Sequence, residues 1–193
     1  MVMKNFTLEL SPVAGYAERT RENVRKSDVT LAIARDFSTA GERLTYHCAR
    51  HCNKPIVRVI HKAPDLDHQV SVFVEAMNRA YEKIQKPLVL NGAGNGLHTL
   101  GEPQKEADDF ALEFLLRALE SPEKKFEIAE IRSGGQTGYD VAIVKAAISL
   151  WIPARIHCAR SLSGHYMIRT ADGTDRAYDR GAYLEKVGIN EAD

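Results

Sequence analysis

The stretch FEIAEIRSGGQTGYDVAIVKAAISL, residues 126–150, combines three signals that decide the fold. An apolar run, Phe126–Ile131, has the length of a buried strand, and Val141–Leu150 has the period of an amphipathic helix. Between them lies the glycine-rich segment Ser133–Asp140. A strand, a glycine loop and a helix in this order direct backbone N–H groups and the positive end of a helix dipole at one point. The stretch therefore predicts a site for a small anion.

The same alternation of short apolar runs and amphipathic runs continues along the chain. Strands are predicted at 29–34, 56–60, 88–90, 126–131 and 154–158, with a possible short edge strand at 6–10. Helices are predicted at 16–26, 41–52, 69–85, 106–120, 141–150 and 178–187. The pattern predicts an α/β fold, a Rossmann-like three-layer sandwich with a mostly parallel sheet of about five or more strands. No linker is long enough to divide the chain, so we expect a single domain over residues 1–193.

Composition narrows the class of protein. The 193 residues are 44% hydrophobic and carry 26 basic and 26 acidic side chains, so the formal net charge is zero. A nucleic-acid-binding domain usually has a basic excess, and this balance argues against one. No apolar run reaches the roughly 18 residues that span a bilayer, and no signal-peptide core is recognisable. Three cysteines are too few for a disulfide framework. We expect a cytoplasmic protein with neither a nucleic-acid nor a membrane partner.

Three loops follow predicted parallel strands, and such loops meet at one edge of the sheet, where ligands bind. Glycines allow close backbone approach, and the hydroxyl, amide and carboxyl groups offer hydrogen bonds. The predicted ligand-binding residues are Arg35, Ser38, Thr39, Gly41 and Glu42 in the first loop, Asn91, Gly92, Gly94, Asn95 and Gly96 in the second, and Ser133, Gly134, Gly135, Gln136, Thr137, Gly138 and Asp140 in the third.

Each loop also has a purely structural interpretation. The glycines of the second loop can serve a tight turn, and Arg35 can form a surface ion pair. Glu42 and Asp140 can favour the helix dipole, with Ser38 or Thr39 as an N-cap. Glu42 and Asp140 are also the weak candidates for catalytic carboxylates.

These motifs resemble a known family. SGGQTGYD at 133–140, followed by WIP at 151–153, resembles the "SGGQTG-x-D … GIP" signature of the putative molybdenum carrier proteins in the SLOG superfamily of Rossmann-like proteins. NGAGNG at 91–96 is similar to that family's "NVAGNG" segment. RTRENVRKSDVT at 19–30 is similar to its "RT-x-x-NV-x-x-SD-x-T" segment. The resemblance extends from about Tyr16 to Tyr183 and implies binding of a nucleotide or a nucleotide-derived ligand.

Two departures qualify what the resemblance implies. The glycine loop follows the Asn-Gly loop here, whereas the carriers have the reverse order, as in a circular permutation. Residues 164–173 are more similar to a "KGW-x-FR-x-x-x-G" segment of uncharacterised bacterial and phage relatives than to the carriers' "CPKGR" region. The "PGG-x-GT-x-x-E" motif of the related phosphoribohydrolases is absent from the sequence. The transfer of molybdenum binding or of catalytic residues is weakened accordingly.

Two other segments have open roles. His47, Cys48, His51 and Cys52 have the i, i+4 spacing of helical metal ligands, but such residues commonly only pack, and no metal site is predicted. In the polar tail, Arg169, Asp172 and Asp175 suit a lid over the site or a cover for the sheet edge, and Tyr166 is a candidate to stack on a base.

Three functions remain open from the sequence. The first is binding of a small anionic, nucleotide-like ligand. The second is a nucleotide-processing hydrolase acting on an N-glycosidic bond, and the third is a molybdate or other oxyanion carrier. No cofactor is identified, and a homo-oligomer is compatible with the fold.

Overall fold

The computed structural model describes residues 6–190 and contains, in that range, one eight-stranded sheet. The strands are β1 (Phe6–Ala14), β2 (Val29–Ala34), β3 (Ile56–Ile60), β4 (Leu88–Gly94), β5 (Ile128–Ser133), β6 (Ala154–Arg160), β7 (Tyr166–Arg169) and β8 (Asp175–Tyr178). The helices are α1 (Tyr16–Arg25), α2 (Ala40–His51), α3 (Leu66–Ile84), α4 (Leu97–Leu100), α5 (Gln104–Glu120), α6 (Tyr139–Ser149) and α7 (Arg180–Val187). Every predicted strand and helix is present.

The sheet is mostly parallel, as predicted. Its order is β3-β2-β4-β5-β6-β7-β8, and β1 pairs with β6 outside this path. The pairs β1–β6, β2–β3, β2–β4, β4–β5 and β5–β6 are parallel, and only β6–β7 and β7–β8 are antiparallel among the described strands. The α/β, Rossmann-like class is thereby confirmed. The single domain over 1–193 stays a prediction.

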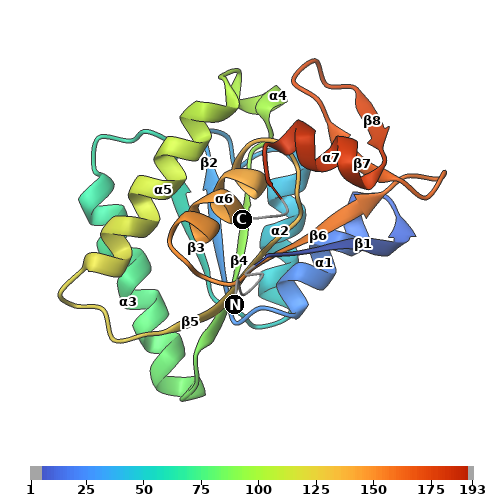
Figure 1. The fold of residues 1–193 in the computed structure, drawn as a ribbon. Coiled ribbons are helices and arrows are strands. Elements are labelled where there is room, and N and C mark those ends of the chain that lie inside the picture. The colour runs from blue at the N-terminus through green and yellow to red at the C-terminus, as the bar shows by residue number, and fades with distance from the viewer. Residues whose placement is uncertain (1–5, 191–193) are drawn as a thin grey trace.

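Helices cover both faces of the sheet. Figure 1 shows α3, α5 and α6 on one face and α1 and α2 on the other. Apolar residues at helical spacing explain why α3 packs there, since Val70, Phe73, Val74 and Met77 are buried along one stripe. The rings of Phe73 and Phe114 meet edge to face at 5.4 Å between centroids, which joins α3 to α5. The core therefore lies between the sheet and its two helical layers.

Two segments differ from the predicted elements. β4 continues to Gly94, so most of the predicted second loop is strand, paired with β2 on one side and β5 on the other. The predicted polar tail contains the antiparallel hairpin of β7 and β8, which extends the sheet beyond β6. Its four-residue strands alternate too briefly for periodicity to reveal them.

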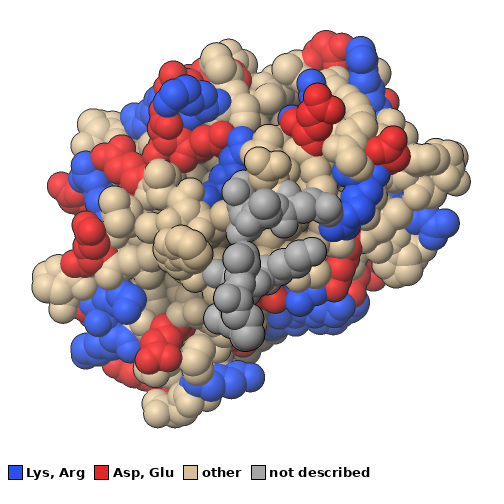
Figure 2. Space-filling model, viewed as in Figure 1, with Lys and Arg blue, Asp and Glu red and all other residues tan. Residues whose placement is uncertain are grey.

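The distribution of charge on the surface and the hydropathy of the helices are as expected from the composition. On the face shown in Figure 2, basic and acidic side chains are interspersed over the helices. No helix within residues 6–190 is long and apolar enough to cross a membrane.

Candidate functional site

A cavity of about 380 Å³ lies at the carboxyl end of β4, between α1 and the N-terminus of α2. That volume is within the range of small-molecule sites, roughly 300–1,000 Å³. Eleven predicted residues line it: Thr39, Gly41, Glu42, Asn91, Gly92, Gly94, Asn95, Gly96, Gly134, Gln136 and Asp140. The three loops therefore meet at one edge, as the parallel sheet requires. Their role in ligand binding stays a prediction.

The glycines of β4 are required by packing. A Cβ on Gly92 would lie 2.6 Å from Cγ2 of Ile143 on α6, and one on Gly94 would lie 2.1 Å from the carbonyl oxygen of Ile33 on β2. Neither distance is tolerable for a carbon atom, so helix α6 and strand β2 can approach β4 only because these side chains are absent. Neither glycine has a positive φ, so the proposed tight turn is not their role.

The N-terminus of α2 forms one wall of the cavity. Thr39 is the N-cap, and its Oγ1 accepts a hydrogen bond from the backbone N–H of Glu42 at 3.3 Å. The first N–H groups of a helix have no intrahelical acceptor, and the helix dipole adds positive potential there. This wall therefore favours a negatively charged or acceptor group in the cavity.

Glu42 occupies an unusual position for a carboxyl group. It is 5% exposed and lines the cavity. Burial and the charge of Asp140 raise the pKa of Glu42 to about 8, and the charge of Arg58 acts in the opposite direction. Near neutral pH, Glu42 therefore holds its proton and can donate a hydrogen bond or a proton to a ligand.

The Asp140 carboxyl group accepts a hydrogen bond from the backbone of the glycine loop that precedes it. Its Oδ2 accepts from Arg19 Nη1 at 2.8 Å and from the backbone N–H of Gln136 at 3.3 Å. Burial raises the pKa of Asp140, while the charge of Arg19 acts in the opposite direction. A Cβ on Gly134 would lie 1.2 Å from Arg19 Nη1, so the loop needs this glycine to admit the guanidinium. An internal carboxylate thus occupies part of the predicted anion site.

Helix α1 contributes a wall that the predicted site residues did not include. Tyr16, Arg19, Thr20 and Asn23 line the cavity. Arg19 is 8% exposed and Asn23 is 2% exposed, and both carry a buried N–H group without a partner, Nε of Arg19 and Nδ2 of Asn23. The i, i+4 spacing of these two residues within the family-like segment 19–30 is the signal that could have identified this face.

Four residues of the glycine loop lie outside the cavity lining, contrary to their predicted placement. Thr137 Oγ1 donates to the carbonyl of Arg169, and the N–H of Gly138 donates to Gln104 Oε1. The carbonyl of Gly135 accepts from Tyr183 Oη at 2.8 Å. Ser133 is fully buried at the end of β5. The loop is thus held by β7, α5 and α7, partners that are distant in sequence and carry no local signal.

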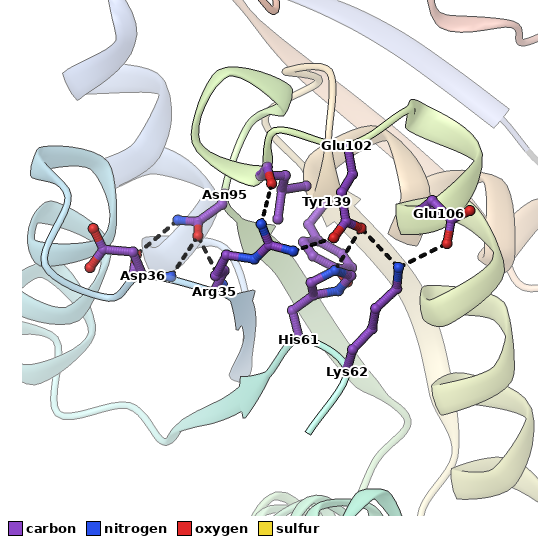
Figure 3. A network of polar contacts seen from close by, with 9 residues as sticks. Arg35, Asp36, His61, Lys62, Asn95, Glu102, Glu106 and Tyr139 are labelled. Carbon is purple, nitrogen blue, oxygen red and sulfur yellow. Dashed lines mark hydrogen bonds and ion pairs between the residues drawn. The ribbon is translucent and has the colours of Figure 1, made fainter. Parts of the chain in front are cut away.

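Arg35 and Ser38 also lie outside the cavity lining. The Arg35 guanidinium donates to the carbonyl of Leu100 and pairs with Glu102, which also accepts from His61 and Lys62 (Figure 3). Arg35 therefore has the structural role of an ion-pair partner. Ser38 is exposed, and its N–H donates to Asp36 Oδ1 at 2.7 Å in the turn before α2.

Asn95 connects the first loop to the second. Its Oδ1 accepts from the backbone N–H groups of Arg35 and Asp36, both at 2.9 Å, and its Nδ2 donates to the carbonyl of Asp36 (Figure 3). The side chain is 2% exposed. Asn95 therefore fixes the turn that leads to the N-terminus of α2.

The β7–β8 hairpin closes one side of the cavity. Arg169 lines it and forms a two-pronged ion pair with Asp175, at 2.9 and 3.0 Å. Tyr16 Oη donates to the same carboxylate at 2.8 Å. Tyr166 stacks on Tyr183, with centroids 5.2 Å apart, and is not among the residues that line the cavity.

The His/Cys segment of α2 lies away from the cavity. His47 and His51 are exposed, and Cys48 and Cys52 are half-buried free thiols. Within residues 6–190, no group of three or more histidine, cysteine, aspartate or glutamate side chains is arranged to hold a metal ion.

Comparisons with known proteins extend these observations. Residues 1–95 match the model of the circularly permutated YpsA SLOG family. A crystal structure described as a putative molybdenum carrier protein from Syntrophus aciditrophicus SB is similar at a TM-score of 0.43 and 23% identity, over 57% of this chain and 61% of that one. The chain thus spans about three fifths of that protein. No curated protein matches. The family match confirms the resemblance, including its permuted order: residues 1–95 are similar to a circularly permutated SLOG protein of the YpsA type.

Proposed function

We propose that this protein binds a small anionic ligand, a nucleotide or a nucleotide-derived molecule, in the cavity between α1 and α2. The observation that carries the proposal is that two residues of the lining, Arg19 and Asn23, each hold a buried N–H donor without a partner, Nε and Nδ2. A buried donor without an acceptor costs about 1–3 kcal/mol, so a ligand that supplies acceptors recovers that free energy.

The shape and chemistry of the lining favour an organic anion over a bare oxyanion. A cavity of about 380 Å³ exceeds what a tetrahedral oxyanion needs, and apolar and aromatic groups such as Leu44, Ala17 and Tyr16 line it beside the polar ones. A phosphorylated nucleoside has both a charged end and a flat heterocycle that suit such a lining. The similarity to a SLOG family is consistent with this class of ligand.

Glu42 favours a second candidate, hydrolysis of an N-glycosidic bond. A carboxyl group that keeps its proton near neutral pH can act as a general acid toward a departing base. Asp140, the other carboxyl group in the lining, is paired with Arg19 and so suits a positioning role better than proton transfer.

Ligand-dependent stabilisation tests the proposal. Thermal unfolding is followed with adenosine monophosphate, ribose 5-phosphate, adenosine and molybdate, each at millimolar concentration. We expect adenosine monophosphate to raise the Tm most, because a ligand that binds only the folded state stabilises it by mass action. A larger shift with molybdate would favour the oxyanion carrier, and no shift with any of the four would refute the proposal. Release of free adenine, measured by chromatography and lost in Glu42→Gln, would establish the hydrolase.

A further inference from the structure

We propose that the anionic group of the ligand binds at the α1 wall, to Arg19, Asn23 and Arg169, and that this group is a phosphate monoester. This inference rests on the proposed function and assigns the position and chemistry of its charged group. It differs from the usual expectation for a glycine loop, in which backbone N–H groups hold the anion.

Two backbone N–H groups of the glycine loop and the Gln136 side chain already have partners within the protein. The N–H of Gln136 donates to Asp140, and the N–H of Gly138 donates to Gln104. The Gln136 side chain is also engaged, since Nε2 donates to the carbonyl of Met167 and Oε1 accepts from the N–H of Arg169. The Asp140 carboxyl group thus already accepts from this loop.

The α1 wall has the opposite character, because its donors are buried and unused. Nη1 of Arg19 pairs with Asp140, whereas Nε of the same guanidinium has no acceptor. Four residues along the helix, Nδ2 of Asn23 is equally buried and without an acceptor. Side chains at i and i+4 lie on one face of a helix, so both donors lie on the same face of α1.

The orientation of the Asn23 amide is fixed from behind. Its Oδ1 accepts from Nε of Arg132 on β5 at 3.4 Å, and Arg132 is itself 6% exposed. Because a guanidinium can only donate, the amide oxygen must face Arg132 and the NH₂ group must face away from it. Asn23 is therefore held as a donor, and Arg132 is its positioning residue.

Arg169 adds a second positive charge on the same side of the cavity. The guanidinium carbons of Arg19 and Arg169 lie 5.8 and 5.6 Å from the centroid of the Tyr16 ring. Each guanidinium already pairs with one carboxylate, Asp140 or Asp175, so a phosphate monoester would share the two guanidinium groups with these partners. Opposite them, Glu42 is protonated near neutral pH, so it does not repel the phosphate.

The Asn23→Asp substitution tests this assignment with little change in shape. The new carboxylate keeps an acceptor for Arg132 but replaces the donor toward the cavity with a negative charge. Titration calorimetry compares the binding of adenosine monophosphate and adenosine to wild type, Asn23→Asp and Arg169→Gln. Asn78→Asp, a half-buried position on α3, makes the same change of charge away from the cavity and serves as the matched control.

We expect Asn23→Asp to weaken adenosine monophosphate binding about 10- to 100-fold, the range for loss of a charge-assisted hydrogen bond, and adenosine binding less than about 3-fold. Arg169→Gln should act in the same direction, and Asn78→Asp should change neither ligand. Equal losses for both ligands in both cavity variants, or no loss, would overturn the α1 assignment and leave the proposed function intact. Failure of wild type to bind either ligand would overturn the proposed function itself.

Discussion

The protonated Glu42 predicts a specific dependence of stability on pH. The pKa of Glu42 is about 8 in the folded protein, against 4.5 for an ordinary glutamate side chain. Between pH 4.5 and pH 8, the folded protein therefore holds a proton that the unfolded chain releases. Raising the pH therefore favours the unfolded state. A shift of about 3.5 pKa units corresponds to at most about 5 kcal/mol, at roughly 1.4 kcal/mol per unit. We therefore expect up to about 5 kcal/mol of stability to depend on this proton.

The Glu42→Gln substitution removes this titration while keeping the shape of the side chain. Urea denaturation of wild type and variant, from about pH 5 to about pH 9, gives the unfolding free energy at each pH. The two proteins should be almost equally stable near pH 5. The unfolding free energy of the variant should then rise relative to wild type with increasing pH, and the difference should reach its full value, up to about 5 kcal/mol, above pH 8.

The difference between the two curves cancels the titrating groups that do not interact with Glu42. Glu127→Gln, at an exposed position before β5, removes the same formal charge and should follow wild type throughout. Parallel curves for wild type and Glu42→Gln would refute a proton held by Glu42. A variant that loses stability with rising pH relative to wild type would show that the carboxylate form is the one stabilised.

Three further substitutions probe the framework of the cavity by urea denaturation. Asn95→Ala removes the acceptor of two part-buried backbone N–H groups and should cost about 1–3 kcal/mol; a cost under about 0.5 kcal/mol would contradict the role of Asn95. Gly92→Ala should cost about 1–3 kcal/mol, less in the presence of Ile143→Ala, and strict additivity would show that the two sites do not touch. Gly134→Ala should cost about 3–5 kcal/mol by displacing the Arg19 guanidinium from its buried partner, and wild-type stability would disprove that contact.

Local periodicity predicted the fold well. The strands at 29–34 and 56–60 have the predicted bounds, because continuous apolar runs of strand length end at clear polar residues. The carboxyl-edge argument also placed Glu42 and Asn91 at one cavity. It worked because a parallel sheet brings successive loops together whatever their sequences are.

The α1 wall and the hairpin could not be predicted in the same way. Arg19 meets Asp140 across 121 residues of sequence, and Thr137 meets Arg169 across 32. Such pairings depend on how elements that are distant in sequence pack together. Neither the residue type nor the local spacing predicts that packing. The glycines of β4 could be located in the sequence, but their role could not be predicted. A glycine required by a neighbouring helix looks the same in sequence as one required by a ligand.

The separation of 121 residues between Arg19 and Asp140 has a consequence during synthesis. At about 5–20 residues per second, roughly 6–24 s pass after the ribosome adds the arginine before it adds its partner. β1 is likewise synthesised long before β6, the strand with which it pairs along Phe6–Leu10. The nascent N-terminal half therefore exposes an unpaired cation and an open sheet edge, which are suited to transient protection by a chaperone. A permuted gene order thus changes the time at which the pocket closes, even where the finished arrangement of loops is the same.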